Sequence, residues 1–264
     1  MSKKDFTIQN KATGKKILAI IPARGGSKGI PRKNIQLLGG RPMIYYMITA
    51  ALGSRYVTHA AFSSEDAEIL RIAKKIGGPD LILVKRPKLL AADKTPTLPV
   101  LQHALKKLER ELNCCFDYLV LLQPNAPLHV AEDIDNAIEI MLKKNADSVV
   151  SVDFVPSYHP VKMKTITNDG RLKQLVPSMP ERIFRRQDLS PCFIRNGGIY
   201  VSARQIILDG NFQLGFMCGP VTYPYVVPSE RSLDIHALYE LLLAEALLKR
   251  MKREGVTFAK QIVR

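Results

Sequence analysis

A glycine-rich loop near the start of the chain carries several cationic side chains. It reads IPARGGSKGIPRKN over residues 21–34 and follows an apolar run, KILAI, that predicts a strand. Glycines allow backbone N–H groups to turn toward an anion, and Arg24, Lys28 and Lys33 add positive charge. The spacing matches neither the Walker A pattern nor GxGxxG. By itself the loop therefore predicts either a phosphate site or a solvated basic surface.

The composition favours an anionic partner. Lys and Arg number 39 against 24 Asp and Glu, which gives a formal net charge of +15. Such a charge favours acidic small molecules, polyanions or anionic membranes. It is also the one feature that suggests a non-enzymatic nucleic-acid-binding protein. The chain has no tryptophan and no zinc-finger or RNP signature, which argues against that alternative.

The cysteines and the apolar segments bear on the compartment. Cys114, Cys115, Cys192 and Cys218 form no CxxC pair, so a reduced compartment is the simpler interpretation. No long apolar segment predicts a signal peptide or a membrane span. We therefore expect a cytoplasmic protein with no membrane partner.

Strand-like and helical stretches alternate as far as residue 154. Apolar runs expected to form strands occupy residues 15–22, 57–64, 80–84, 117–124 and 148–154. Segments with helical periodicity lie between them, at 42–52, 65–77, 95–112 and 131–145. This alternation predicts an α/β fold with a mainly parallel sheet and helices on both faces. In such a sheet, ligands bind at the carboxyl ends of the strands.

The alternation stops after residue 154. Residues 155–193 are rich in Pro, Lys and Arg, and NDGRL within them is typical of a hairpin turn, so we expect an inserted arm. NGGIYVS at 196–202 predicts a further strand. A final helix is expected within 232–255, with an apolar face that includes Leu238, Leu241, Leu242, Leu248 and Met251. Residues 1–15 predict a polar basic tail, which leaves 16–264 as a single domain.

Several segments, taken in order, resemble the acylneuraminate cytidylyltransferases, the CMP-sialic acid synthetase family. They span residues 16–247 and are the opening loop, FSSED, VKRPKLLAADKTPT, LLQPNAPL, YHPVK, RRQD, NGGIYV and SLDI. Enzymes of this family join CTP to a nine-carbon keto-sugar acid. The resemblance implies a Rossmann-like nucleotidyltransferase fold and a homodimer in which the inserted arm is exchanged between subunits.

The resemblance also implies a nucleotide-binding set. Arg24 and Lys33 match the family's phosphate-binding arginine and lysine, and Arg86 in KRP matches an arginine at the cytosine end of the site. A guanidinium offers a planar fork to phosphate oxygens, whereas an ammonium offers a point charge. The implied set is Arg24, Ser27, Lys28, Lys33, Asn34 and Arg86.

A second implied set binds the sugar acid. Gln123 in LLQP matches a glutamine that orients this substrate. The whole set is Gln123, Lys162, Arg186, Asn196 and Tyr200. Each has an ordinary structural alternative: Gln123 can satisfy backbone groups at a strand end, Tyr200 can belong to the core, and Lys162 can be a surface lysine. Their joint occurrence favours the functional interpretation.

Asp234 in SLDI matches the first of two aspartates that are associated with Mg²⁺ in this family. His236 stands at the position of the second. Mg²⁺ prefers oxygen ligands but binds through one or two carboxylates plus substrate phosphates. Asp234 would then suffice, with His236 hydrogen-bonding a coordinated water, or the metal affinity would be reduced. As a structural alternative, Asp234 is a good N-cap candidate for the final helix. The implied catalytic set is Arg24, Lys33, Gln123 and Asp234.

Two further segments depart from the family pattern. Asn125, Ala126 and His129 replace Thr, Ser and Arg in the segment after LLQP, and Arg195 lies one place later than usual. The departures indicate either a different sugar acid or a loss of activity, and the complete opening loop favours the first. The resemblance implies transfer of CMP from CTP to the anomeric hydroxyl of a nonulosonic acid. A legionaminic, pseudaminic or Kdo-like acid is the alternative substrate.

Overall fold

The computed structural model describes residues 13–27, 29–155, 157–177, 188–210 and 215–256, together with residues 185, 212 and 258. Most of the expected N-terminal tail, residues 1–12, lies outside these residues. Lys28 and Arg186 also lie outside them.

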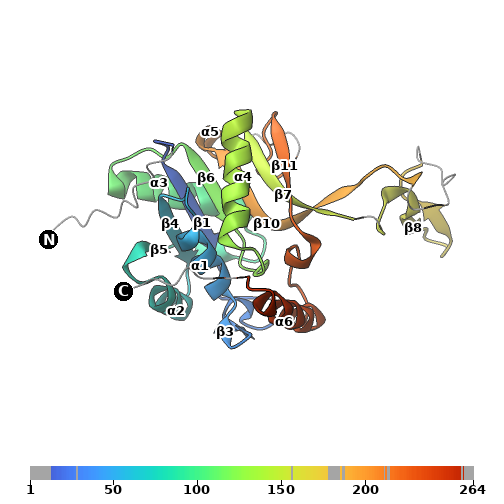
Figure 1. The fold of residues 1–264 in the computed structure, drawn as a ribbon, viewed down its shortest axis with the longest axis horizontal. Helices are drawn as coiled ribbons and strands as arrows, with labels where there is room; N and C mark the ends of the chain where they lie inside the picture. The colour runs from blue at the N-terminus through green and yellow to red at the C-terminus, as the bar shows by residue number, and fades with distance from the viewer. Residues whose placement is uncertain are drawn as a thin grey trace.

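A seven-stranded sheet forms the centre of the molecule (Figure 1). Its strands run in the order β11-β7-β10-β6-β1-β4-β5, and all neighbours are parallel except those of β10, which runs antiparallel to β6 and β7. In chain order they are β1 (Ile17–Pro22), β4 (His59–Ser64), β5 (Leu81–Lys85), β6 (Tyr118–Leu122), β7 (Ser148–Phe154), β10 (Phe193–Ala203) and β11 (Thr222–Val226). The predicted α/β fold with a mainly parallel sheet is confirmed.

Two apolar cores lie on opposite faces of this sheet. In β1, Ile17, Ala19 and Ile21 belong to one core, whereas Leu18 and Ile20 belong to the other. Side chains of a strand alternate between faces, so a strand buried on both faces is apolar throughout. The first core is covered by α1 (Ile44–Gly53), α2 (Ala67–Gly77) and α4 (Ala131–Lys144). The second is covered by α3 (Thr97–Leu112) and α5 (Arg204–Asp209).

Strand β11 was not expected from the sequence. Pro224 interrupts its short apolar run, and proline cannot donate a ladder hydrogen bond, so it is confined to positions such as edge strands. The strand lies at the edge of the sheet and pairs with β7 alone.

The final helix, α6 (Leu238–Arg253), packs on a third apolar cluster around the small hairpin of β2 (Leu37–Leu38) and β3 (Arg41–Pro42). Leu248 and Met251 are buried there as predicted. The prediction was wrong for Leu238 and Leu242, which are 63% and 61% exposed. They lie beside the exposed Tyr239 and Leu243 on a part of the helix that the described chain leaves uncovered.

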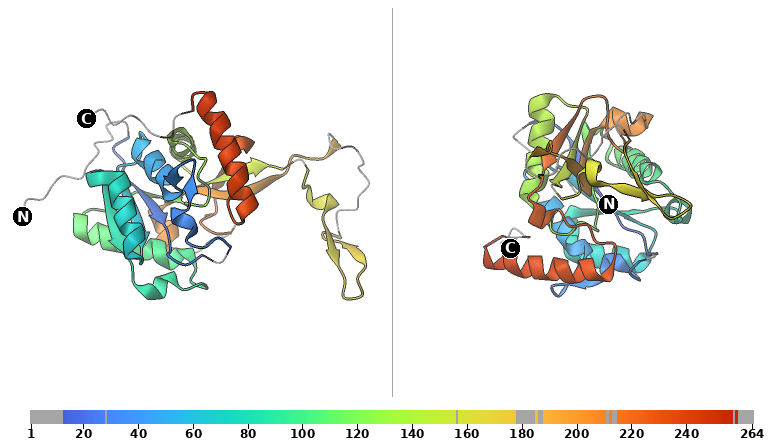
Figure 2. Two further views of the ribbon diagram at one scale, coloured as in Figure 1. Left: turned by 90° about the horizontal axis from the view of Figure 1, so that it is seen from below. Right: turned by 90° about the vertical axis from the view of Figure 1, so that its right-hand side faces the viewer.

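The chain between β7 and β10 extends away from the sheet as an arm (Figures 1 and 2). Its described part contains the antiparallel pair β8 (Lys164–Ile166) and β9 (Leu172–Gln174), joined by the predicted NDGRL turn. Short 3-10 turns complete the described elements: η1 (Lys33–Ile35), η2 (Gly78–Asp80), η3 (Lys88–Ala91), η4 (Pro160–Lys162) and η6 (Ser229–Arg231). Within the residues described, no helix is long and apolar enough to cross a membrane.

Candidate active site

Strands β1, β4, β5 and β6 run parallel and end at one edge of the sheet, where a cavity of about 390 Å³ opens. Six of the predicted nucleotide and sugar residues line it: Arg24, Ser27, Lys33, Asn34, Arg86 and Gln123. His236, from the segment before α6, lines it as well. Residues spread over more than 200 positions of the chain therefore meet at the edge where ligands bind in open α/β sheets.

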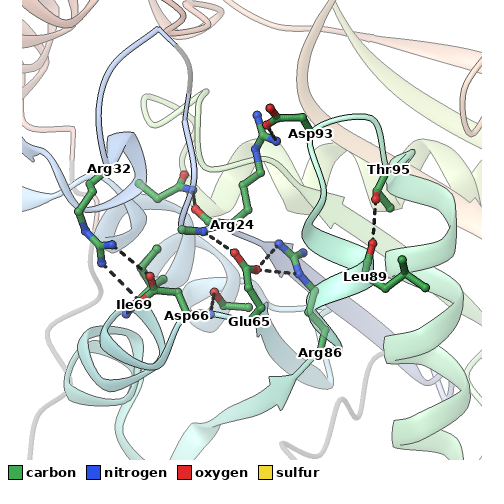
Figure 3. Close-up of polar contacts among 12 residues, drawn as sticks. Arg24, Arg32, Glu65, Asp66, Ile69, Arg86, Leu89, Asp93 and Thr95 are labelled. Carbon is green, nitrogen blue, oxygen red and sulfur yellow. Dashed lines mark hydrogen bonds and ion pairs between the residues drawn. The ribbon is translucent and has the colours of Figure 1, made fainter.

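The opening loop holds its cationic groups toward the cavity. Asn34 is buried, and its amide donates to the Arg24 carbonyl at 2.9 Å, which fixes the two ends of the loop against each other. The Arg24 guanidinium forms an ion pair with Asp93 at 2.7 Å (Figure 3). Asp93 lies in VKRPKLLAADKTPT and was not among the predicted site residues.

Lys33 reaches across to the segment before α6. Its ammonium donates to the Ile235 carbonyl at 2.7 Å. Arg32, immediately before it, has a left-handed backbone with φ of 51°, a conformation that few non-glycine residues adopt. Burial lowers the pKa of the Lys33 ammonium, although the nearby Asp234 opposes this shift. The cavity is therefore lined by a half-buried ammonium group that donates to a neutral carbonyl oxygen.

Arg86 also lines the cavity and is almost completely buried. Its guanidinium makes two hydrogen bonds to Glu65, the first residue after β4 (Figure 3). Glu65 lies in FSSED, one of the segments that carry the resemblance, and was not among the predicted site residues. Its acidic type next to a strand end was the available signal.

Of the residues predicted to bind the sugar acid, some line the cavity and others do not. Gln123 lines the cavity, and its backbone N–H donates to the Gly198 carbonyl of β10. Asn196 and Tyr200 come from β10 but do not line the cavity. Asn196 is buried against Ser151, while Tyr200 packs edge-on against Phe216 in the second core. Their roles in substrate binding stay predictions.

Lys162 is exposed in η4, within the arm that extends away from the sheet (Figure 1). It does not line the cavity of its own subunit. A role for Lys162 in sugar binding therefore requires the arm of a second subunit.

Asp234 contacts two of the residues that depart from the family pattern. The Asn125 amide donates to one carboxylate oxygen, and the His236 ring lies beside the other. The alternative of Asp234 as an N-cap is wrong: Ala237 occupies the N-cap of α6, and the Glu240 carboxylate accepts the backbone N–H groups of His236 and Ala237. Asp234 itself does not line the cavity, but its carboxylate contacts Asn125 and His236, which do.

The Asp234 carboxylate suits a Mg²⁺ ion that takes its other ligands from the substrate phosphates and water. Within the described part of the chain, no group of three or more His, Cys, Asp and Glu side chains is arranged to hold a metal ion. A hard cation that binds through one carboxylate and the phosphates of its substrate needs no such group. Asp234 is the residue that would hold it, and the imidazole of His236 suits a water ligand better than the metal itself.

Comparisons with known proteins define the class. The fold matches that of a solved CMP:2-keto-3-deoxy-manno-octonic acid synthetase complexed with CTP, with a TM-score of 0.63 at 16% identity, over 89% of this chain and 99% of that one. This likeness shows the α/β fold. A family model described as Cytidylyltransferase matches residues 18–206. The chain belongs to the cytidylyltransferase family.

Three curated relatives are similar over most of this chain. Post-translational flagellin modification protein B of Campylobacter coli is 30% identical over 92% of this chain and 99% of its own length. CMP-N,N'-diacetyllegionaminic acid synthase of Legionella pneumophila is 33% identical over 89% of this chain and 97% of its own length. N-acylneuraminate cytidylyltransferase of Streptococcus agalactiae serotype V is 33% identical over 91% of this chain, which spans 58% of that protein. The predicted resemblance is confirmed.

Proposed function

We propose that this protein transfers CMP from CTP to the anomeric hydroxyl of a nonulosonic acid and releases pyrophosphate. The observation that carries the proposal is the grouping of Arg24, Lys33, Arg86 and Gln123 around one cavity at the carboxyl edge of the sheet. Membership of the cytidylyltransferase family supports the reaction type. Relatives named for acylneuraminate and diacetyllegionaminic acid support the substrate class.

The chemistry fits a cavity lined by fixed cations. The anomeric hydroxyl oxygen forms a bond to the α-phosphorus of CTP, the bond from that phosphorus to the bridging oxygen breaks, and the hydroxyl proton is released. Negative charge spreads over the phosphoryl oxygens and the departing pyrophosphate. Arg24 and Lys33 would stabilise this charge because they are already held at the cavity by the loop and need little reorganisation.

The proposed cofactor is Mg²⁺, held by Asp234 together with the phosphates of CTP. When bound, it would neutralise phosphate charge. Gln123 would orient the sugar acid, since its amide both donates and accepts hydrogen bonds. Arg24, Lys33, Gln123 and Asp234 thus form the proposed catalytic set, and Ser27, Asn34 and Arg86 complete the described nucleotide residues.

The proposed assembly is a homodimer with exchanged arms. Large apolar side chains are exposed along the arm and the uncovered part of α6, and contiguous exposed apolar surface is typical of interaction sites. They are Tyr158, Met163, Ile166, Leu172, Leu175, Phe193, Ile194, Leu238, Tyr239 and Leu242. Exchange would also bring Lys162 toward the cavity of the neighbouring subunit.

Pyrophosphate release from each of the four nucleoside triphosphates tests the reaction. The acceptors are acylneuraminic, legionaminic, pseudaminic and Kdo-type acids. Of the four nucleotides, we expect only CTP to support turnover, and of the acceptors we expect one nonulosonic acid to be preferred.

Arg24→Ala should lower the rate about 10²–10³-fold while the protein stays folded, because a preorganised donor to the phosphoryl charge is lost. Arg71→Ala, at an exposed site on α2, is the matched control. Wild-type protein that releases no pyrophosphate with any pair would contradict the proposal.

A further inference from the structure

Glu65 connects two parts of the candidate nucleotide site. One carboxylate oxygen, Oε1, accepts from the Gly25 backbone N–H at 2.7 Å. The other, Oε2, accepts from Nε and Nη2 of Arg86 at 3.1 and 2.9 Å. Figure 3 shows the glutamate between the opening loop and Arg86. A single side chain at the end of β4 therefore joins the ends of β1 and β5.

These contacts are shielded from solvent. The side chain of Arg86 is 4% exposed and that of Glu65 is 15% exposed. Exposed ion pairs contribute little to stability. A buried guanidinium that loses its partner, however, is left as an uncompensated charge, which is strongly unfavourable. Charge-assisted hydrogen bonds to both carboxylate oxygens also fix the glutamate rotamer. The position of Arg86 thus depends on Glu65.

The loop lies directly against the same strand end. A Cβ atom at Gly25 would meet a carboxylate oxygen of Asp66 at 2.6 Å, so a larger residue there would require the Asp66 side chain to move. Asp66 also pairs with Arg32, at 3.1 Å, near the other end of the loop. Two consecutive acidic residues therefore hold the loop at both ends, and Arg24 directly precedes the residue that Glu65 contacts.

The contacts with Glu65 also determine what Arg86 can bind. They use Nε and Nη2, and within the described residues no partner contacts Nη1. A guanidinium paired with a carboxylate attracts phosphate less strongly than a free one does. Nη1 is then suited to donate to a neutral acceptor, such as a carbonyl oxygen of a nucleobase.

We propose that Glu65 is a positioning residue for the nucleotide. Its carboxylate sets the place of Arg86 relative to the opening loop and so shapes the cavity that is proposed to hold CTP. This inference rests on the proposed function, because it concerns how the same cavity holds CTP.

Glu65→Gln tests the inference through separate kinetic constants for the two substrates. Gln keeps the length of the side chain but removes the charge that compensates Arg86. We expect the KM for CTP to rise about 10–100-fold, since a displacement of about 1 Å in a positioning group has effects of that size. The KM for the sugar acid should stay within about twofold, because Glu65 contacts only the nucleotide side. Glu254→Gln is the matched control: this exposed carboxylate pairs with Arg250 at the end of α6 and should change neither constant.

A double variant tests whether Glu65 acts through Arg86. Glu65→Gln and Arg86→Gln should each raise the KM for CTP, and the double variant should raise it much less than the product of the two effects, because they share one contact. If Glu65→Gln alone does not fold, the KM for CTP of the double variant is compared with that of Arg86→Gln, and the two values should be similar. An unchanged KM for CTP in folded Glu65→Gln, equal effects on both substrates, or fully multiplicative effects in the double variant would overturn the inference. Inactive wild-type protein would instead count against the proposed function.

Discussion

The imidazole Nε2 of His236 lies 2.8 Å from the carboxylate Oδ2 of Asp234. The Asn125 amide donates to the other oxygen, Oδ1. His236 and Asn125 are two of the positions at which the sequence was expected to depart from the family pattern. Both contact a single carboxylate, although 109 positions separate Asn125 from Asp234 in the chain.

The first prediction concerns this carboxylate. Asp234→Asn should nearly abolish pyrophosphate release, because it removes the carboxylate proposed to hold Mg²⁺. It should change the free energy of unfolding by less than about 1 kcal/mol, since the side chain is partly exposed and does not cap α6. His236→Asp should lower the Mg²⁺ concentration for half-maximal rate, because it adds a second oxygen ligand. Initial rates titrated with Mg²⁺ in the three proteins check this. Full activity of Asp234→Asn at ordinary Mg²⁺ would place the metal elsewhere.

Gln123→Ala should impair use of the sugar acid and leave CTP binding nearly intact. The loss of a hydrogen-bonding amide should raise the KM for the sugar acid about tenfold. Calorimetric binding of CTP, set beside steady-state kinetics, separates the two substrates. Gln102→Ala serves as the control, because that amide bonds to the Ile207 and Leu208 carbonyls away from the cavity. An equal loss of CTP affinity in Gln123→Ala would mean that the sugar pocket is misplaced.

The affinity for CTP should fall at alkaline pH because Lys33 loses its charge. Burial lowers the pKa of this ammonium below the ordinary 10.5, so deprotonation begins at a lower pH than for an exposed lysine. The charged form binds phosphate, and affinity is therefore lost as the pH rises through the lowered pKa. Dissociation constants measured along a pH series check this. Lys33→Arg should move the loss to higher pH, since arginine stays protonated. A midpoint at or above 10.5 in the wild type would show that another group is responsible.

Mixing two inactive variants tests the exchanged arm. Lys162→Ala and Arg24→Ala should each be weakly active. After unfolding and refolding together, about half of the dimers are mixed and each mixed dimer has one intact site, so about a quarter of the wild-type rate should return. Arg24→Ala mixed with Gln123→Ala is the control, because both residues line the cavity of one subunit. The same rate in both mixtures, or a monomer in sedimentation analysis, would contradict arm exchange.

A buried carboxylate in α4 should contribute strongly to the free energy of unfolding. Asp133 accepts hydrogen bonds from the Val130 backbone, the Tyr225 hydroxyl and the Arg231 guanidinium. Asp133→Asn should lower the free energy of unfolding by about 3–5 kcal/mol, because Arg231 loses a buried partner. Denaturant titration checks this, with the exposed Glu132→Gln as control. A loss no larger than that of Glu132→Gln would contradict it.

The same carboxylate gives the stability a pH dependence. Burial alone raises the pKa of Asp133, but His129, Arg231 and Tyr225 more than offset this, and the pKa lies below its ordinary value of 3.8. The contribution is therefore complete above about pH 4 and is lost as the pH falls further. In Asp133→Asn, the loss of stability as the pH falls below about 4 should therefore be smaller than in the wild type.

Local patterns determined much of the fold. The apolar runs that became β1, β4, β5, β6 and β7 could be predicted because a strand buried on both faces must be apolar throughout, and the helices between them kept a 3.6-residue period. The opening loop could be recognised because its glycines and cations are neighbours in the chain.

Only the tertiary structure decided which side chains meet. Glu65 contacts residues 40 positions before it and 21 positions after it, and nothing in the local spacing indicates either contact. Leu238 and Leu242 fit the helical period of α6, yet what covers each part of a helix depends on its neighbours, and in the described chain only the part around Leu248 is covered. Crossover connections bring the ends of parallel strands together whatever their separation in sequence. The site at that edge is therefore fixed by the order of the strands in the sheet, which the spacing of residues along the chain does not encode.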